Sequence, residues 1–291
     1  MNNCRYPFVL LLCIFTVFAC SDNSDNSASI ENNDEFENAR LREELIDSAK
    51  SSDHSWLLKM ILGSPKNTIR SIGILVYNGV NDLDMMGPRY IFGQTGIKPM
   101  LIGIDSGSFK TSMGLEIKPN TIIDSITQLD ILIIPGGGQG TLHTAYNEHV
   151  LGWIKSIDQG TIYTCSVCTG AWILGAAGLL KNKKACTNWY RENKFLNKYG
   201  AIPVNERYIN DGKYWSSAGV TAGMDMSLAI VQDNWGKRHA QGIMLDMEYD
   251  PLPPIKGGSP EKTPWVVKWM MESMYDSFLI PLLDSLESNK L

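Results

Sequence analysis

Short apolar runs alternate with longer amphipathic stretches from about residue 71 onward. Four runs rich in Ile, Leu and Val are predicted to be strands, at 72–77, 99–104, 129–135 and 161–167. They are apolar at nearly every position, which is typical of strands buried on both faces of a parallel sheet. Helices are predicted at 87–95, 141–159, 169–180, 190–199 and 220–235, and a polar hairpin at 207–217 turning at 210–212. The alternation predicts a three-layer, doubly wound α/β domain over 66–255, with sites at the carboxyl ends of its strands.

The C-terminal segment, 256–291, is predicted to be an extension that carries one apolar helix over 264–283. Its apolar side chains fall on a helical stripe formed by Trp265, Val266, Trp269, Met270, Met274, Phe278 and Leu282. Packing against the core is the default interpretation of such a stripe. Part of the stripe could instead form the seam of a homodimer, and the sequence alone does not choose between the two.

The N-terminus has the pattern of an export signal. Arg5 precedes an apolar run at 8–19, which is shorter than the roughly 20 residues of a membrane span. The sequence 17–20, Val-Phe-Ala-Cys, resembles a bacterial lipobox, so we expect 1–19 to be a lipoprotein signal peptide and Cys20 to be lipidated. An uncleaved anchor and an ordinary cleaved signal are the alternatives. The interpretation implies a bacterial cell envelope location, with the protein facing the periplasm or exterior.

Composition places the chain in the globular class. Its 291 residues are 44% hydrophobic and 20% charged, which excludes a wholly disordered or collagenous protein. The net charge of -5 provides no polycationic face, so we expect no nucleic-acid partner. Residues 21–60 hold ten acidic and four basic side chains, whereas 61–291 are balanced. We therefore interpret 20–65 as an acidic tether with short helices at 35–50 and 55–62.

One predicted strand runs into Ser166-Val167-Cys168-Thr169-Gly170, and a helix follows. A nucleophile with small residues on either side is the pattern of a nucleophile elbow, a sharp turn that exposes the reactive atom. At a helix N-terminus, free N–H groups and the helix dipole favour the thiolate of Cys168. The alternatives are a buried structural cysteine, or a redox or zinc pair with Cys165. Zinc needs about four ligands, and the sequence shows no further Cys pair or His cluster, so we predict no metal.

Two more loops follow predicted strands and carry candidate chemistry. In Pro135-Gly136-Gly137-Gly138-Gln139-Gly140, glycine backbone N–H groups could face an oxyanion formed at Cys168, although such a run can also be a simple tight turn. In the loop at 81–88, Asp84 is a candidate general acid or base, or alternatively the N-cap of a helix that begins near Gly87-Pro88. Of the four histidines, only His143 lies near the glycine loop in sequence, and none is assigned a role.

Several separated motifs between about 70 and 250 resemble the ThiJ/PfpI superfamily, which has a class-I glutamine-amidotransferase-like, flavodoxin-like fold. They lie at 74–88, 132–140, 165–189, 214–231 and 248–260. The last two are the most discriminating, and the segment 251–260, together with the Leu-Asp-x-x-Gly-Pro segment at 83–88, is similar to the isonitrile hydratase branch. The protease branch has Cys-His-Gly at the elbow, whereas this chain has Cys168-Thr169-Gly170, so the resemblance does not favour a protease.

The resemblance implies that Cys168 is the nucleophile, Thr169 its essential neighbour and Asp84 the partner acid. The implied reaction is the hydration of an isonitrile to an N-substituted formamide through a thioimidate on Cys168. Backbone N–H groups at Gly137, Gly138 and Thr169 would stabilise developing charge, with Gly170 completing the elbow. The substrate is expected to be a small molecule, no cofactor is required, and relatives suggest a homodimer.

This chain departs from its relatives in two ways. They commonly have Thr-Thr-His-Trp after the elbow helix, whereas this chain has Cys186-Thr187-Asn188-Trp189. The expected envelope location is also unusual for a branch whose members are mostly cytoplasmic. Two other hypotheses therefore stay open. One is a glyoxalase-like or amidase-like activity on the same thiol, and the other is a non-enzymatic envelope protein that binds a ligand or senses oxidants.

Overall fold

The computed structural model describes residues 39–40, 42–43 and 63–289. The predicted signal peptide, Cys20 and the helix expected at 55–62 lie outside the described residues. Within the helix expected at 35–50, residues 39–40 and 42–43 are helical. The chain divides into two compact units, Met1–Met60 and Ile61–Leu291, and the second carries the fold described below. Among the helices of the described segments, none is long and apolar enough to cross a membrane.

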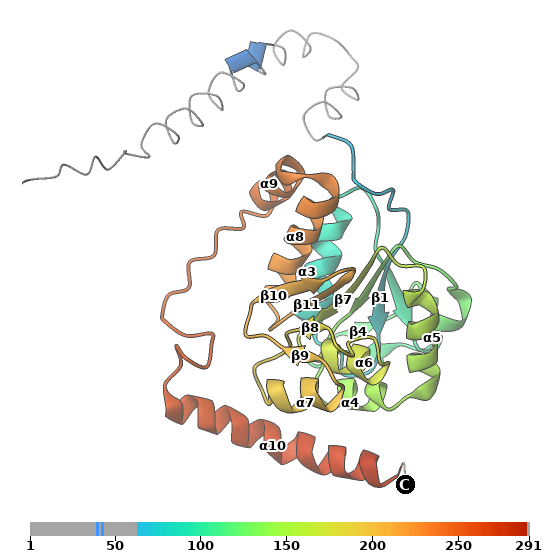
Figure 1. Ribbon diagram of the computed structural model, residues 1–291, viewed down its shortest axis with the longest axis vertical. Helices are drawn as coiled ribbons and strands as arrows, with labels where there is room; N and C mark the ends of the chain where they lie inside the picture. Colours follow the sequence, from blue (N-terminus) through green and yellow to red (C-terminus); the bar gives the residue numbers. More distant parts are fainter. Residues whose placement is uncertain (1–38, 41, 44–62, 290–291) are drawn as a thin grey trace, which may run out of the picture. The chain divides into compact units, whose positions relative to one another are not determined.

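A seven-stranded sheet forms the centre of the second unit, in the order β10-β11-β7-β6-β1-β2-β5 (Figure 1). Every neighbouring pair is parallel except the β10–β11 hairpin. The strands are β1 Ile72–Val76, β2 Met100–Gly103, β5 Thr121–Ile122, β6 Ile131–Ile134, β7 Tyr163–Val167, β10 Tyr208–Asp211 and β11 Tyr214–Ser217. All residues of β1, β6 and β7 are buried, as the continuous apolar sequence predicts for β1 and β6, whereas β7 also buries Thr164 and Ser166.

Helices cover both faces of this sheet. They are α3 Asp82–Gly93, α4 Gln139–Ala145, α5 Glu148–Asp158, α6 Gly170–Ala176, α7 Glu192–Lys198, α8 Ala222–Trp235, α9 Lys237–Asp246 and α10 Trp265–Ser288. Helices α3, α8 and α9 form one outer layer, whereas α4, α5 and α6 pack together in the other (Figure 1). The predicted three-layer, doubly wound α/β fold is thereby confirmed.

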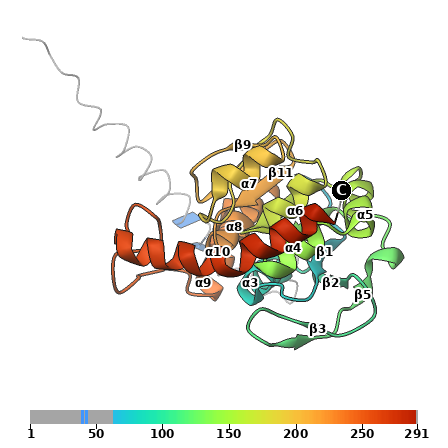
Figure 2. The same cartoon turned by 90° about the horizontal axis from the view of Figure 1, so that it is seen from below.

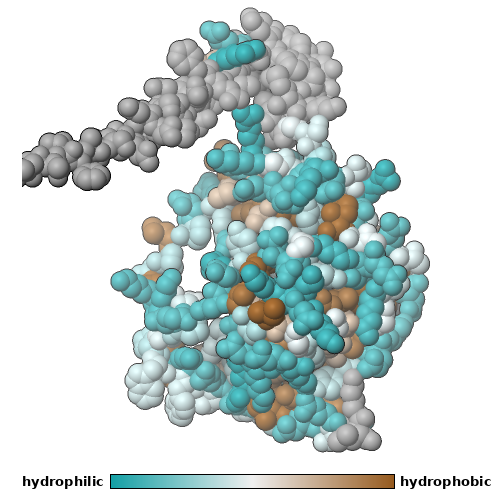
Figure 3. Space-filling view, viewed as in Figure 1, coloured by the Kyte–Doolittle hydropathy of each residue, from teal (hydrophilic) through white to brown (hydrophobic). Residues whose placement is uncertain are grey.

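Short pieces of structure complete the unit. Two-stranded sheets pair β3 Phe109–Lys110 with β4 Glu116–Ile117, and β8 Lys184–Ala185 with β9 Ile202–Pro203, and a 3-10 turn covers Ile123–Ser125. The predicted hairpin at 207–217 is present as β10 and β11, and it turns at Gly212, whose φ is 67°. Figure 3 shows a mainly hydrophilic outer face, because the apolar side chains of the sheet are enclosed between the helical layers.

Several helices differ from the prediction. Helix α3 begins five residues earlier than expected, because the Asn81 side chain accepts hydrogen bonds from the N–H groups of Leu83 and Asp84. The single helix expected at 141–159 is two helices, since Asn147 caps a new helix by accepting from Val150 N. Helix α6 ends at Ala176 rather than near 180, and α9 was not predicted.

The C-terminal helix α10 is present and runs five residues beyond its predicted end (Figure 1). Its second half packs on the domain, where Leu279 and Leu283 are buried with Leu142, Trp172 and Phe195. Its first half carries the exposed members of the predicted stripe, Trp265, Val266, Trp269, Met270 and Met274. Core packing therefore describes only the second half of the helix.

Candidate active site

Cys168 lies in the turn between β7 and α6. Its φ is 58°, in the left-handed region that a residue with a side chain rarely adopts. The strained turn is held by a hydrogen bond from Cys168 N to Ser217 O (3.1 Å) on β11. At Gly170 a Cβ atom would lie 2.0 Å from Ile134 O, so only glycine lets α6 start this close to β6. The strand–turn–helix geometry is that of the expected elbow.

Asp84 lies in the first turns of α3 and is fully buried. The interpretation of Asp84 as a helix N-cap is wrong, because Asn81 occupies that position and Gly87 and Pro88 lie inside the helix. One carboxylate oxygen, Oδ2, accepts a hydrogen bond from Gly136 N (3.0 Å). The other, Oδ1, is buried without a hydrogen bond of normal geometry to any described residue. The Cys168 thiol interacts with the same carboxyl group, so the candidate acid lies beside the candidate nucleophile.

The glycine loop separates Asp84 from Thr169. A Cβ atom at Gly136 would lie 2.5 Å from Thr169 Oγ1 and 2.8 Å from Asp84 Oδ2, so this position must lack a side chain. Gly137 N donates to Thr169 Oγ1 (3.1 Å), and that hydroxyl also contacts Thr141 Oγ1 (2.9 Å). Because the Gly137 N–H already has this partner, Thr169 holds the glycine loop in place. Gly138, with φ 55°, is the residue before α4.

The segment after the elbow helix also reaches Cys168. Thr187 Oγ1 donates to Cys168 O (2.7 Å), and Asn188 Nδ2 donates to Cys168 Sγ (3.5 Å). The side chain of Asn188 is thus a neutral donor to the sulfur. Members of the isonitrile hydratase branch, which the sequence resembles, commonly have histidine at this position. The sequence pointed to Asn188 only as a departure from that pattern and gave it no role.

Burial controls the protonation of both reactive groups. It raises the pKa of Asp84 to about 7, although the Gly136 N–H and the Cys168 thiol act in the opposite direction. Burial, and then the negative charge of Asp84, raise the pKa of the Cys168 thiol, against the lowering effects of the Thr169 N–H and the Asn188 amide. Desolvation therefore opposes the preference for thiolate that the helix N-terminus was expected to give.

The other candidate groups lie apart from this chemistry. Cys165 and Cys186 are buried free thiols, and burial raises the pKa of each. His143 is exposed on α4. Across residues 39–40, 42–43 and 63–289, no group of His, Cys, Asp and Glu is arranged to hold a metal ion.

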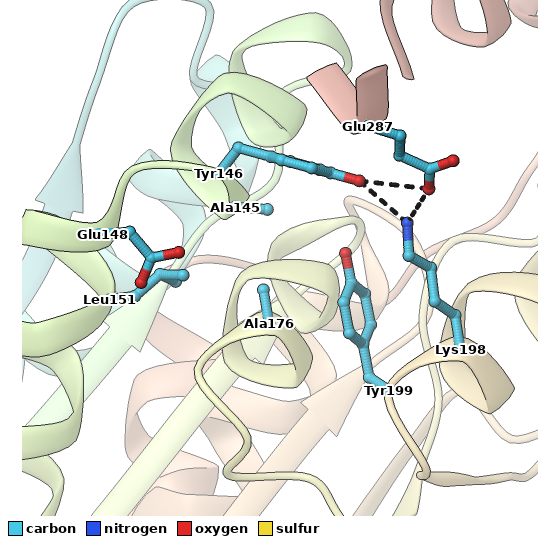
Figure 4. A pocket seen from close by; sticks show the side chains of 8 residues that line it. All are labelled: Ala145, Tyr146, Glu148, Leu151, Ala176, Lys198, Tyr199 and Glu287. Carbon is cyan, nitrogen blue, oxygen red and sulfur yellow. Dashed lines mark hydrogen bonds and ion pairs between the residues drawn. The ribbon is translucent and has the colours of Figure 1, made fainter. Parts of the chain in front are cut away.

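A cavity of about 280 Å³ lies elsewhere, lined by side chains from α4 to α7 and by the end of α10 (Figure 4). Lys198 Nζ bonds to Tyr146 Oη (3.0 Å) and pairs with Glu287 at one side of it. The residues that line this cavity are Ala145, Tyr146, Glu148, Leu151, Ala176, Lys198, Tyr199 and Glu287. None of them belongs to the thiol site, so the two features are separate.

Comparison with known proteins identifies the domain. A profile of the DJ-1/PfpI family matches residues 70–233, which include Asp84, the glycine loop and Cys168. The chain belongs to the DJ-1/PfpI family. Helix α10 lies outside the matched range. The matched range therefore contains the candidate nucleophile and acid.

Individual relatives refine this assignment. An isonitrile hydratase from Pseudomonas putida is 38% identical over 198 residues, covering 67% of this chain and 86% of the relative. A crystal structure of a ThiJ/PfpI family protein from Pseudomonas syringae has a TM-score of 0.73 and 31% identity, and covers 80% of this chain and 96% of that one. A deglycase from Thermococcus kodakarensis is 24% identical over 146 residues, 50% of this chain and 87% of the relative.

Proposed function

We propose that this DJ-1/PfpI domain is an isonitrile hydratase-like enzyme that uses Cys168 as its nucleophile. The 38% identity to an isonitrile hydratase supports the reaction class. The observation that carries the proposal is the pairing of a buried thiol, whose pKa is raised, with the buried carboxyl of Asp84, whose pKa is about 7. A carboxyl group with such a pKa can both accept and return a proton near neutral pH.

The proposed reaction begins with addition of the thiol to the terminal carbon of the isonitrile, R–NC. Asp84 accepts the S–H proton as the sulfur forms its bond to carbon, and then returns that proton to the same carbon. The product is a thioimidate, R–N=CH–S–Cys168. Water adds to the C=N bond with its proton passing to nitrogen, and the C–S bond then breaks. Cys168 regains a proton and the formamide R–NH–CHO is released, so the net change is addition of one water.

The other predicted site residues have supporting roles in this scheme. The Thr169 N–H, which lowers the pKa of Cys168, stabilises negative charge on the sulfur. Thr169 Oγ1 orients the glycine loop through Gly137. Stabilisation of charge by the N–H groups of Gly137 and Gly138 remains a proposal, and Gly137 N–H would have to leave the Thr169 hydroxyl to provide it.

Turnover of n-butyl isonitrile tests the proposal, with N-butylformamide measured by mass spectrometry. We expect the wild-type chain to form the formamide and Cys168→Ala to lose turnover completely. Cys165→Ala is the matched control, because it removes a buried thiol from the strand that leads into the elbow and leaves the elbow residues unchanged. Equal turnover by Cys168→Ala and the wild type would contradict the mechanism.

A second candidate is a small-carbonyl activity on the same thiol, such as a glyoxalase-like or amidase-like reaction. The observation in its favour is the 24% identical deglycase. A non-enzymatic redox or ligand-sensing role is the third candidate, based on the free thiols Cys165, Cys168 and Cys186. Mass spectrometry of Cys168 separates the three, because a trapped thioimidate, a carbonyl adduct and an oxidised sulfur differ in mass.

The proposed setting is the bacterial cell envelope, with the chain anchored through a lipid on Cys20. Its support is the lipobox-like sequence and the polar segment that follows it. Replacing Cys20 with Ser should move the protein from the membrane fraction to the soluble fraction, and an unchanged distribution would contradict lipidation at Cys20. We also propose a homodimer, supported by the exposed apolar residues on the first half of α10.

A further inference from the structure

Helix α10 is fastened to the segment that follows the elbow helix. Arg191 donates from Nε and Nη2 to the Asp276 carboxylate, at 2.9 and 2.7 Å, and Tyr190 Oη donates to the same group at 2.5 Å. On the other side of the helix, Gln139 Nε2 donates to Phe278 O (3.4 Å). Figure 2 shows α10 crossing α4. The middle of α10 is therefore held between α4, the helix that follows the glycine loop, and the segment that carries Asn188.

Tyr275 is the residue of α10 whose ring packs on the segment that follows Asn188. Its ring lies 5.0 Å from the ring of Tyr190 and 6.0 Å from that of Trp189, measured between centroids. Trp189 directly follows Asn188, whose amide contacts Cys168 Sγ. Burial and the charge of a Cys168 thiolate both raise the pKa of Tyr275. The three rings thus form one aromatic cluster beside the segment that contacts the sulfur.

We propose that Tyr275 forms the outer wall of the substrate site at Cys168 and determines which substituents the substrate can carry. The inference rests on the proposed function. In an isonitrile the reacting carbon points to the sulfur, so the N-substituent extends away from the elbow towards the surrounding walls. A wall of aromatic rings binds apolar substituents and limits their length, and it offers no charge to a polar one. The substrate class is therefore an isonitrile with a compact apolar substituent.

This wall comes from outside the part of the chain that matches the family profile, which ends at residue 233. The nucleophile and acid lie within the matched range, whereas the proposed specificity-determining residue lies on α10, beyond its end. Tyr275 can therefore be replaced without touching the groups that carry out the chemistry. Leu279 and Leu283 keep α10 packed on the domain when Tyr275 is changed.

The test compares kcat/KM for methyl, n-butyl and benzyl isonitrile in the wild type, Tyr275→Ala and Tyr275→Trp. A change of one or a few carbon groups in an apolar pocket alters kcat/KM by roughly tenfold or more. We expect the benzyl-to-methyl ratio to rise about tenfold in Tyr275→Ala and to fall in Tyr275→Trp. Trp265→Ala is the control, since it removes an exposed aromatic side chain from the same helix. Ratios unchanged in both Tyr275 variants would overturn the proposal.

A second measurement keeps this proposal apart from the proposed reaction. Alkylation of Cys168 by iodoacetamide or by bulkier N-benzyl iodoacetamide, in which sulfur displaces iodide, is followed by peptide mass spectrometry. Tyr275→Ala should raise the benzyl-to-parent rate ratio about tenfold, and Tyr275→Trp should lower it. If the wild type turns over no isonitrile but these ratios shift, the proposed reaction is contradicted and the role of Tyr275 as a wall of the site is supported. If turnover occurs and the labelling ratios stay constant, the wall is wrong.

Discussion

Replacing Asp84 with Asn should stabilise the protein at neutral and alkaline pH while removing its activity. In the folded chain, burial raises the pKa of the Asp84 carboxyl from 3.8 to about 7. The folded state therefore holds this proton more tightly than the unfolded state does. The stability contributed by the protonated carboxyl is present below about pH 4, is lost as the pH rises, and is gone above about pH 7.

The size of the effect follows from the same pKa change. One pKa unit corresponds to about 1.4 kcal/mol, so the rise from 3.8 to about 7 amounts to about 4 kcal/mol over the whole titration. An Asn side chain has no charge to desolvate and can keep the hydrogen bond from Gly136 N. We expect Asp84→Asn to gain stability over the wild type by up to about 1.4 kcal/mol per pH unit between about pH 4 and 7. The gain should then level off.

Urea denaturation of the full chain at half-unit steps from pH 4.5 to 8 provides the measurement. Asp250→Asn is the control, because Asp250 is exposed and its replacement should leave the wild-type pH profile unchanged. Above pH 7 the full effect corresponds to a Tm difference on the order of 10 °C for a folded unit of this size. Parallel stability–pH profiles for Asp84→Asn and the wild type would refute the reasoning, because they would mean that Asp84 titrates normally. Loss of the proton carrier should lower kcat by roughly 10²–10⁴-fold.

Three further changes test the site and the surface around it. Asn188→Ala removes the donor to Cys168 Sγ and should slow alkylation of Cys168 by roughly 2- to 10-fold, as measured by labelling kinetics; an equal rate would show that the amide does not act on the sulfur. Gly136→Ala places a Cβ 2.5 Å from Thr169 Oγ1, so it should cost about 1–3 kcal/mol of stability and remove most of the turnover. Gly152→Ala, whose Cβ would lie in open space on α5, should leave stability unchanged or raise it. Trp269→Glu introduces charge on the exposed half of α10 and should give a monomer by light scattering if this surface joins two copies, whereas an unchanged dimer mass would place the interface elsewhere.

The sequence predicts the fold well where apolar residues are continuous. Strands β1 and β6 are apolar and buried at every position, so their runs carry a strong local signal. Helix α9 carries no such signal, since its first turn is Lys237-Arg238-His239 and only Ala240 and Ile243 are buried. It is held by packing against α8, which no local pattern records. The break between α4 and α5 depended on one capping side chain within an otherwise helical stretch.

The site likewise combines residues that are neighbours in sequence with residues that only the fold brings together. Cys168, Thr169 and Gly170 are neighbours in sequence, so the elbow could be recognised from residue types alone. The contacts of Gly136 with Asp84 and Thr169 join segments that are 52 and 33 residues away along the chain, and only the folded sheet brings them together. Asn188 reaches Cys168 Sγ in the same way, and Tyr275 reaches the rings of Trp189 and Tyr190. Their roles could not be deduced from their own surroundings in the sequence.

The replacement of a histidine by Asn188 is consistent with the proton balance of the proposed reaction. An isonitrile carbon must receive both the sulfur and a proton, so an enzyme that permanently ionises its thiol would still have to find that proton elsewhere. A positively charged imidazole beside Cys168 would favour the thiolate. The neutral amide of Asn188 gives the sulfur a hydrogen bond without that charge, while burial raises the pKa of the thiol. On this mechanism the thiol and Asp84 together hold the proton that the carbon needs, and Asn188→His should shift the optimum for turnover to lower pH, because a histidine cation lowers the pKa of both groups.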